Sequence, residues 1–330
     1  MNSRARAWYD QRTWHWRDWP AELLLDRKRR AQTRISVVIP ARDEERTVAG
    51  VVGALRAALM EQVPLIDEVV VIDSDSADRT ATEAARAGAT VYRARDIAPE
   101  LGSYPGKGEA LWKSLHVTKG DLLVFVDADL TQWGPHFVTG LLGPLFAEPG
   151  VMLVKGFYAR VAAGTDGSAS TEGGRVTELV ARPLLSLWWP ELSGVVQPLA
   201  GEWSARRELM ESLAIPLGYG VELSTLLDTA ARRGLDAIAQ VDLDARAHKH
   251  QTDHDLALMA AELLMVAERR RPVKGNGPVP ASPHLVQFVR EDGHVRPVAR
   301  PVPVQERPPV TGLLRRPASQ DPASRDGARQ

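Results

Sequence analysis

Short apolar segments alternate with segments of helical periodicity through the first half of the chain. Apolar, β-branched segments cover residues 34–40, 67–73, 89–94 and 121–130, and helical patterns follow the first two of them and precede the last. Because each apolar segment is nearly continuous, we expect strands that are buried on both faces of a sheet. The alternation predicts an α/β fold with a doubly wound, mostly parallel sheet, right-handed crossovers and helices on both faces.

Three polar clusters follow these predicted strands, at residues 41–45, 73–78 and 127–130. Open parallel sheets bind ligands beyond the carboxyl ends of their strands. A functional site is therefore expected where the three clusters meet. The competing interpretation is that Asp75, Ser76 and Asp78 only form a turn and a helix cap, and we favour it for those three. For Asp73 and Ser74, nearest the strand end, binding of a base or ribose is favoured.

The third cluster is the stretch FVDADL, residues 125–130, which places Asp127 and Asp129 on either side of Ala128. Residues i and i+2 of a strand share a face, so both carboxylates point the same way if the strand continues. Two adjacent carboxylates repel each other, and a hard divalent cation that also binds a diphosphate relieves that repulsion. The alternative is that the pair caps the next turn.

Composition excludes several functional classes. The chain has 330 residues, a formal net charge of −1 and no cysteine. It is therefore not expected to bind nucleic acid or an anionic membrane by charge, or to use thiol chemistry. No leader peptide or apolar stretch of bilayer length is seen, so a cytoplasmic protein without membrane insertion is expected. The spacings of a P-loop and of a dinucleotide fingerprint are absent as well.

The chain divides into four regions by pattern. Residues 1–33 form a Trp- and Arg-rich N-terminal extension, whose tryptophans either dock on the core or make a partner surface. Residues 34–150 form a Rossmann-like half with alternating strands and helices, and residues 151–271 form a second half with a different pattern. The remainder, 272–330, is Pro-rich and expected to be largely disordered.

Three further motifs carry polar groups at predicted loops. Lys107 stands between two glycines in PGKGEALW, where backbone can approach a ligand and the ammonium can neutralise a phosphate. GGRVTE, residues 173–178, places an arginine at a helix start, which suits an anion. RAHKH, residues 246–250, follows a strand and offers His248 as a metal ligand beside the aspartates, although a lone histidine is more often structural.

Together PARDEE, VIDSDSADRT, PGKGEALW, FVDADL, GGRVTELVARPLL, GYGVE and RAH resemble the glucosyl-3-phosphoglycerate synthases, over roughly residues 34–255. These are retaining glycosyltransferases of GT-A fold, and the mannosyl-3-phosphoglycerate synthases share the pattern. The resemblance implies transfer of glucose from UDP-glucose to the 2-hydroxyl of 3-phosphoglycerate, with Mg²⁺ or Mn²⁺ as cofactor and a homodimer as the assembly. The family retains the α configuration. Because no convincing carboxylate nucleophile is seen, our hypothesis is same-face attack, with the leaving phosphate accepting the proton.

The resemblance also implies that residues 34–150 bind the nucleotide sugar and residues 151–271 the acceptor, and it implies roles for matching positions. Residues of the nucleotide-sugar site would be Pro40, Ala41, Arg42, Asp43, Glu44, Ser74, Lys107, Asp127, Ala128, Tyr219 and Glu222. Acceptor-binding residues would be Gly174, Arg175, Val176, Thr177, Arg246 and His250. Asp129 and His248 would bind the metal, and the catalytic residues would be Asp129, Lys107 and Glu222.

The sequence departs from the family pattern at several of these positions. The family usually has leucine and asparagine where Arg42 and Asp43 stand, serine at Ala128 and asparagine at His250. Arg42 beside the base leaves the nucleotide open, so a GDP-mannose donor is an alternative. A sugar nucleotidyltransferase and a binding module that senses sugar nucleotides without turnover are alternatives from other classes.

Overall fold

The computed structural model of the chain describes residues 2–162, 169–170, 174–248, 253–271, 284–291 and 294–314. The strands predicted in the first half form a four-stranded parallel part of one sheet, in the order β5-β2-β3-β4. Their bounds are β2 (Ile35–Ala41), β3 (Glu68–Asp73), β4 (Thr90–Arg93) and β5 (Leu122–Phe125). The carboxyl ends of β2 and β3 lie side by side, because Ala41 pairs with Asp73.

The second half of the chain extends this sheet, whose full order is β1-β10-β6-β8-β5-β2-β3-β4, with β7 paired to β6. The added strands are β1 (Thr13–His15), β6 (Leu153–Ala162), β7 (Ala169–Ser170), β8 (Trp203–Arg206) and β10 (Ile238–His248). β8 runs antiparallel to both of its neighbours, β5 and β6. The predicted mostly parallel, doubly wound sheet is confirmed, with β8 as the strand that joins its two halves.

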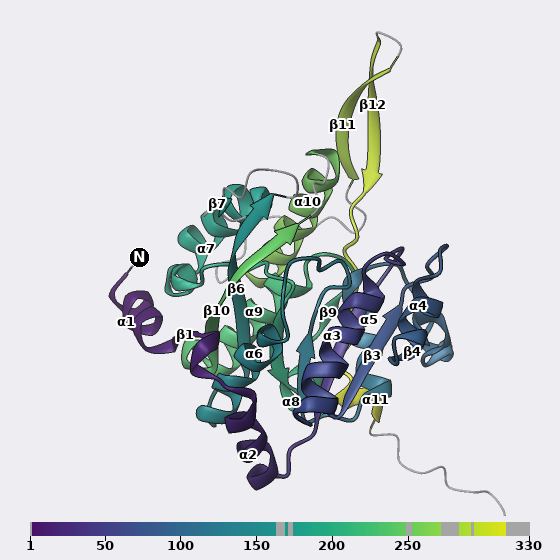
Figure 1. Cartoon of the computed structure of the whole chain (residues 1–330). Helices are drawn as coiled ribbons and strands as arrows, with labels where there is room; N and C mark the ends of the chain where they lie inside the picture. The colour runs from purple at the N-terminus through teal and green to yellow at the C-terminus, as the bar shows by residue number, and fades with distance from the viewer. Residues whose placement is uncertain are drawn as a thin grey trace, which may run out of the picture.

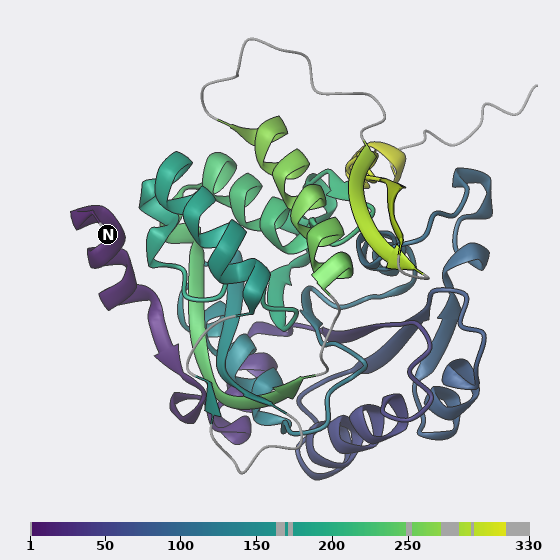
Figure 2. The ribbon, with the colours of Figure 1, turned by 90° about the horizontal axis from the view of Figure 1, so that it is seen from above.

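Helices cover both faces of the sheet and enclose two hydrophobic cores (Figure 2). One core includes residues of α2 (Ala21–Ala31), α3 (Val48–Arg56), α4 (Thr80–Arg86) and α6 (His136–Ala147). The other includes residues of α1 (Ser3–Arg12), α5 (Lys107–Val117), α7 (Arg182–Trp188), α8 (Arg207–Ser212), α9 (Val221–Arg233) and α10 (Asp253–Arg270). No helix in the described part of the chain is long and apolar enough to cross a membrane.

Short 3-10 and π segments join these elements. They are η1 (Trp16–Asp18), η2 (Ala57–Gln62), η3 (Ala94–Asp96), η4 (Pro99–Leu101), η5 (Thr177–Ala181), η6 (Pro190–Gly194) and η7 (Leu235–Ala237). Two of them, η2 and η5, are π-helical and adjoin α3 and α7. Each of these two helices therefore has a π-helical segment at one end.

The N-terminal segment belongs to the folded core. β1 pairs in parallel with β10, and the side chain of Trp8 is 1% exposed. Trp8 Nε1 donates a hydrogen bond to the backbone oxygen of Ile238 at 2.9 Å. This bond gives the buried indole N–H a partner and fixes α1 against the start of β10. Of the two roles left open for the tryptophans, docking on the core is the one that Trp8 fulfils.

The sequence placed the aspartate pair at the end of a continuing strand, and this detail is wrong. β5 ends at Phe125, and Ala128 and Asp129 already lie in a turn. Strand alternation therefore does not set the directions of the two carboxylates. They converge instead because both are hydrogen-bonded to one guanidinium group, described below.

Order extends into the tail, where the sequence predicted disorder. The described residues there form β11 (His284–Glu291), β12 (His294–Pro301), β13 (Glu306–Arg307) and α11 (Thr311–Leu314). The β11–β12 hairpin projects from the body, and the chain then returns to place α11 near α5 and α8 (Figure 1). Val302 and Val304 are buried, whereas Pro301, Pro303 and Gln305 are exposed, so this Pro-rich stretch has the alternating pattern of a half-buried extended segment.

Candidate active site

Lys107 lies between two carboxylates at the carboxyl edge of the sheet. Its Nζ is 2.6 Å from Asp127 Oδ1 and 2.8 Å from Glu222 Oε1. The lysine begins α5, Asp127 follows β5, and Glu222 is in the first turn of α9, so three separate elements converge here. Burial alone would lower the pKa of Lys107, but the two carboxylates outweigh it and raise that pKa. The ammonium group is therefore charged at any physiological pH.

A second buried cation, Arg246, joins the two aspartates. Its guanidinium donates to Asp129 Oδ1 at 2.9 Å and lies 3.4 Å from Asp127 Oδ2. Burial raises the pKa of Asp127, yet the charges of Lys107 and Arg246 prevail and hold that pKa at about 2. The like-charge repulsion anticipated from the sequence is thus relieved by side chains of the chain itself.

Arg246 also contacts two residues that the sequence analysis missed. It donates to both oxygens of Glu202, at 2.8 and 2.9 Å, and to the hydroxyl of Tyr158 at 2.9 Å. Glu202 is fully buried, and burial raises its pKa, partly offset by Arg246. The available signal was a glutamate between apolar residues in LAGEW, because a carboxylate at such a position requires a buried partner.

Lys155 is a third buried cation near the site and was not predicted. It is 1% exposed, donates to the backbone oxygen of Ala200 at 2.8 Å, and lies 5.5 Å from the ring centre of Trp203. Burial lowers its pKa to about 8. The bond fixes the turn before Gly201, a residue whose missing side chain leaves room for the Asp127 carboxylate. A Cβ on Gly201 would lie 2.2 Å from Asp127 Oδ2.

The glycines on either side of Lys107 allow two loops to meet backbone to backbone. A Cβ on Gly106 would lie 2.2 Å from the oxygen of Leu217, and one on Gly108 would lie 1.7 Å from the oxygen of Pro216. Gly106 also has φ of +132°, a conformation that favours glycine. The glycines therefore allow close contact with the loop that leads to Glu222, besides any room that they leave for a ligand.

The two loops expected to bind the base are joined by reciprocal hydrogen bonds. Asp43 accepts from the backbone of Ala77 at 2.8 Å through Oδ1, and its own N–H donates to Ser76 Oγ at 3.0 Å. The backbone of Glu44 donates to Thr80 Oγ1 at 2.8 Å, and Ser74 N–H donates to Ala41 O at 2.9 Å. The turn role favoured for Ser76 matches these contacts. Asp78 has such a role too, because its Oδ2 accepts from the backbone N–H of Glu45 at 3.1 Å. Asp43 also holds the turn, through its side chain.

Glu262 on α10 holds the loop of Tyr219 from behind. Its Oε2 accepts a hydrogen bond from Tyr219 N–H at 2.6 Å, and a Cβ on Gly218 would lie 2.1 Å from that oxygen. Burial raises the pKa of Glu262 to about 7; the Tyr219 N–H opposes this rise and Glu222 adds to it. Tyr219 itself is 46% exposed at the mouth of the site.

The remaining predicted residues fall in three groups. Pro40, Ala41 and Arg42 end β2 and begin its loop, and the Arg42 side chain is 62% exposed. Gly174, Arg175, Val176 and Thr177 lie just before and at the start of η5, with Val176 and Thr177 buried. β10 includes His248, whose side chain lies outside the described residues, as do His250 and most of the loop 164–175.

The side chains that could bind a metal at this edge are carboxylates. Within the part of the chain that the structure describes, no group of three or more His, Cys, Asp or Glu side chains gathers in a metal cluster. Asp129, with 28% of its side chain exposed, accepts from Arg246 through Oδ1. Carboxylate oxygens suit hard cations, and a ligand diphosphate and water ordinarily complete such a shell. Asp129 therefore fits a site for Mg²⁺ or Mn²⁺ that is completed by substrate.

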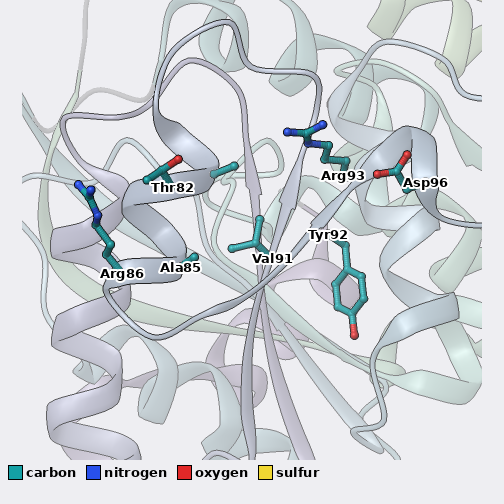
Figure 3. Close-up of a pocket in the computed structure, with 8 residues that line it drawn as sticks. Thr82, Ala85, Arg86, Val91, Tyr92, Arg93 and Asp96 are labelled. Carbon is teal, nitrogen blue, oxygen red and sulfur yellow. The ribbon is translucent and has the colours of Figure 1, made fainter.

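A surface hollow of about 760 Å³ lies elsewhere, at the outer edge of the sheet (Figure 3). It is formed by α4, the edge strand β4 and the residues just after it. Its lining residues are Ala81, Thr82, Ala85, Arg86, Val91, Tyr92, Arg93 and Asp96. None of them belongs to the charged cluster of Lys107 and Arg246, so the chemistry is assigned to that cluster and not to this hollow.

Known proteins resemble the chain in both sequence and structure. Residues 36–193 match the family model described as Glycosyl transferase family 2. A glucosyl-3-phosphoglycerate synthase of Mycolicibacterium smegmatis is 42% identical over 306 residues, which cover 93% of this chain and 98% of that protein.

Solved structures extend the comparison. A glucosyl-3-phosphoglycerate synthase of Mycobacterium tuberculosis, in complex with Mn²⁺, UDP-glucose and phosphoglyceric acid, matches with a TM-score of 0.78 and 42% identity over 89% of this chain and 95% of its own. The mannosyl-3-phosphoglycerate synthase of Rubrobacter xylanophilus matches with a TM-score of 0.85 and 38% identity over 94% of this chain and 98% of its own.

The fold and the charged site at its carboxyl edge define a glycosyltransferase of GT-A type. Within that class, the identity of 42% over about nine-tenths of the chain decides the family. The chain belongs to the glucosyl-3-phosphoglycerate synthase family.

Proposed function

We propose that the protein transfers glucose from UDP-glucose to the 2-hydroxyl of 3-phosphoglycerate, with retention of the α configuration. The observation that carries the proposal is the buried Lys107, held between Asp127 and Glu222 where the strands end. A cation fixed in a shielded site is suited to the negative charge of a departing nucleoside diphosphate. A relative of 42% identity has been solved with UDP-glucose and phosphoglyceric acid bound, which supports these two substrates.

The donor site is assigned to the 34–150 half together with the loop before α9. Lys107 would contact the diphosphate or the sugar, Asp127 and Ala128 the ribose and diphosphate, and Tyr219 and Glu222 the glucose. The uridine pocket would be lined by Pro40, Ala41, Arg42, Asp43, Glu44 and Ser74. Among these six, Asp43 uses its side chain to join the two loops, so it would shape the pocket by holding them together.

The acceptor site is assigned to the 151–271 half. Arg246 and His250 would lie by the acceptor phosphate, and Gly174 to Thr177 would hold the rest of 3-phosphoglycerate at the start of η5. Arg246 is already bonded to Glu202 and Asp129, so it can bind the acceptor only as part of this network. The network would fix the acceptor relative to the donor, which is mainly an entropic contribution to the rate.

Metal binding is assigned to Asp129 and His248. When bound, Mg²⁺ or Mn²⁺ supplies a Lewis acid beside the diphosphate. The carboxylate of Asp129 would hold the metal ion in place. Arg246 would orient that carboxylate through its bond to Oδ1. A hydrogen bond to a metal-binding carboxylate commonly fixes its orientation and tunes its basicity.

The proposed step proceeds on one face of the sugar. The bond between the anomeric carbon and the diphosphate oxygen breaks, and the 2-hydroxyl oxygen of the acceptor bonds to that carbon from the same side. The hydroxyl proton passes to the departing phosphate oxygen. Glu222 is not assigned as a nucleophile, because its carboxylate is paired with Lys107 at 2.8 Å. Detection of a glycosyl adduct on Glu222 would overturn this assignment.

The protein is further proposed to act as a homodimer in the cytoplasm. An apolar surface on the η5–α7 segment supports self-association: Leu179 and Leu187 are each 75% exposed, and Pro183 between them is exposed too. Single exposed leucines are ordinary, whereas several on one segment point to a contact surface. Light scattering coupled to size exclusion tests this, and Leu187→Glu is expected to shift the mass toward the monomer.

A mannosyl donor is the second candidate, and one observation favours it. The mannosyl-3-phosphoglycerate synthase of Rubrobacter xylanophilus aligns with a TM-score of 0.85, against 0.78 for the UDP-glucose complex. Overall similarity of this kind reflects the scaffold more than the few side chains that select a base and a hydroxyl. The donor must therefore be established by assay.

Release of nucleoside diphosphate tests the proposal. Purified protein with Mg²⁺ or Mn²⁺ and 3-phosphoglycerate is given UDP-glucose, GDP-glucose or GDP-mannose in parallel, with EDTA in a control. We expect UDP release that requires both the metal and the acceptor. Release from a GDP-sugar alone would change the donor and keep the mechanism. Release from none of the three would contradict the proposed activity.

A further inference from the structure

A buried ion pair links the C-terminal segment to the helix that begins with Lys107. The segment 301–314, here called the C-terminal strap, includes Arg307, whose side chain donates to both oxygens of Glu109 at 2.7 and 2.6 Å. Glu109 is 1% exposed and Arg307 is 7% exposed. Two parallel bonds between a planar guanidinium and a carboxylate fix their relative orientation as well as their distance.

The same guanidinium holds the turn that precedes Lys107. It donates to the backbone oxygens of Leu101 and Gly102 at 2.7 and 3.0 Å. It also lies 4.7 Å from the ring centre of Tyr104 and 4.5 Å from that of Trp112. Arg307 therefore contacts residues on both sides of Lys107 and joins α5 to the turn before it, where Tyr104 N–H also donates to Glu109 Oε1 at 3.3 Å.

The strap supports the opposite wall of the site as well. β13 pairs with β9 (Ile215–Pro216), and Leu217 N–H donates to the oxygen of Gln305 at 3.3 Å. Glu306 accepts from Arg270 of α10 at 2.7 Å. Residues 215–220 lead into α9 and Glu222, so the strap joins the loops that carry both partners of the Lys107–Glu222 pair.

We propose that Arg307 is a positioning residue for the transfer reaction, and that the strap fixes Lys107 and Glu222 at the distance the donor requires. Arg307 does not reach the reacting groups itself; it acts through Glu109, two residues after Lys107. Small displacements of a catalytic group cost rate, of the order of 10²-fold for about 1 Å. This inference rests on the proposed function only for its kinetic consequence, since the structural coupling is independent of substrate.

Arg307→Lys is the informative variant. Lysine keeps the positive charge opposite Glu109 but lacks the planar fork and cannot bond Leu101, Gly102 and Glu109 together. Glu109→Gln is the second variant, since it keeps the shape of the Glu109 side chain and removes its negative charge. Leu24→Ala, in the core on the other face of the sheet, is the matched control for a loss of stability that does not involve the strap.

Hydrogen exchange of the unliganded protein is the primary readout. In Arg307→Lys we expect amide exchange of residues 101–112 and 215–222 to rise by about tenfold or more, with β2 and β3 unchanged. In steady-state assays we expect the KM for UDP-glucose to rise or kcat to fall by roughly 10- to 100-fold, with the KM for 3-phosphoglycerate unchanged. Leu24→Ala, measured at the same number of degrees below its own Tm, should show neither the local rise in exchange nor the change in kcat or in the KM for UDP-glucose.

The outcomes separate the two proposals. Unchanged exchange at residues 101–112 and 215–222, or an equal rise throughout the chain, would overturn the positioning role. If the wild-type protein turns over none of the sugar donors while the local exchange pattern appears as expected, the proposed function fails and the coupling by Arg307 stands. If Arg307→Lys does not fold, the same two readouts on Glu109→Gln decide.

Discussion

Lys107 Nζ lies 2.6 Å from Asp127 Oδ1, across the edge of the sheet where β5 ends and α5 begins. The pair joins a cation to a carboxylate whose pKa is held at about 2, so both groups are charged in the resting protein. A donor diphosphate that entered this place would compete with Asp127 for the ammonium group. The resting pair thus keeps the cation in position without a ligand.

Removing the Lys107 charge should lower the activity of the protein. We expect Lys107→Met to lower kcat/KM by roughly 10²- to 10³-fold, the usual range for loss of one group that stabilises developing charge. Lys119→Met, an exposed lysine just beyond the end of the same helix, is the control. Wild-type kcat/KM in Lys107→Met, measured by release of UDP, would show that the cation has no part in the reaction.

A methyl group at Gly201 should displace Asp127. The Cβ of alanine would lie 2.2 Å from Asp127 Oδ2, so the carboxylate must shift and its bond to Lys107 must change. We expect Gly201→Ala to lower activity by about 10²-fold while circular dichroism remains that of a folded protein. Gly50→Ala, in α3 with nothing within 4 Å of the added atom, is the matched control and should retain activity.

Arg246 and Glu202 should be strongly coupled in stability. Loss of Arg246 alone leaves a fully buried carboxylate without its main partner, which typically costs about 3–5 kcal/mol of the free energy of unfolding. The double replacement Arg246→Met with Glu202→Met removes both charges, so we expect it to be less destabilised than Arg246→Met. Urea unfolding of the wild type, Arg246→Met, Glu202→Met and the double variant forms a double-mutant cycle that measures the coupling energy.

The surface pair Arg4–Asp236 is the comparison for the double-mutant cycle of Arg246 and Glu202. Its atoms are 2.6 Å apart, but the side chains are 55% and 58% exposed, so coupling of at most ~1 kcal/mol is expected. Equal coupling energies for the buried and the exposed pair would refute the burial argument.

Glu262 should make stability fall as pH rises. Its pKa is raised by burial from 4.5 to about 7, so between these values the folded state binds more protons than the unfolded state. Stability contributed by this group is therefore complete below about pH 4.5 and is lost as pH rises to about 7. Glu262→Gln should match the wild-type Tm near pH 4.5 and exceed it by at least ~2 °C at pH 8. A constant difference in Tm across this range would argue against a raised pKa.

The fold could be predicted from the sequence because strand burial leaves a plain pattern. Continuous apolar runs at β2, β3 and β5 identify strands covered on both faces, and the helices between them require parallel connections. Antiparallel β8 was not predicted, because a single short strand gives no sign of its direction. The order of the C-terminal strap was missed because its proline content outweighed the alternate burial of Val302 and Val304.

Part of the site could be predicted for a similar reason. Lys107, Asp127 and Glu222 stand next to glycines or at strand ends, where local sequence marks a loop that can hold a ligand. Glu202, Tyr158 and Arg307 lie far from these motifs in the chain, and only the folded structure brings them to Arg246 and Glu109. Long-range ion pairs of this kind leave no periodic signal in a single sequence.

The structure of the product tests the central claim most directly. Protein is incubated with UDP-glucose, 3-phosphoglycerate and Mg²⁺, and the purified product is analysed by proton and carbon NMR. We predict one glucosyl residue with a small H1–H2 coupling, characteristic of the α anomer, bonded to the oxygen on carbon 2 of the phosphoglycerate. A β anomer, a linkage at another atom, or free glucose as the sole product would contradict the account.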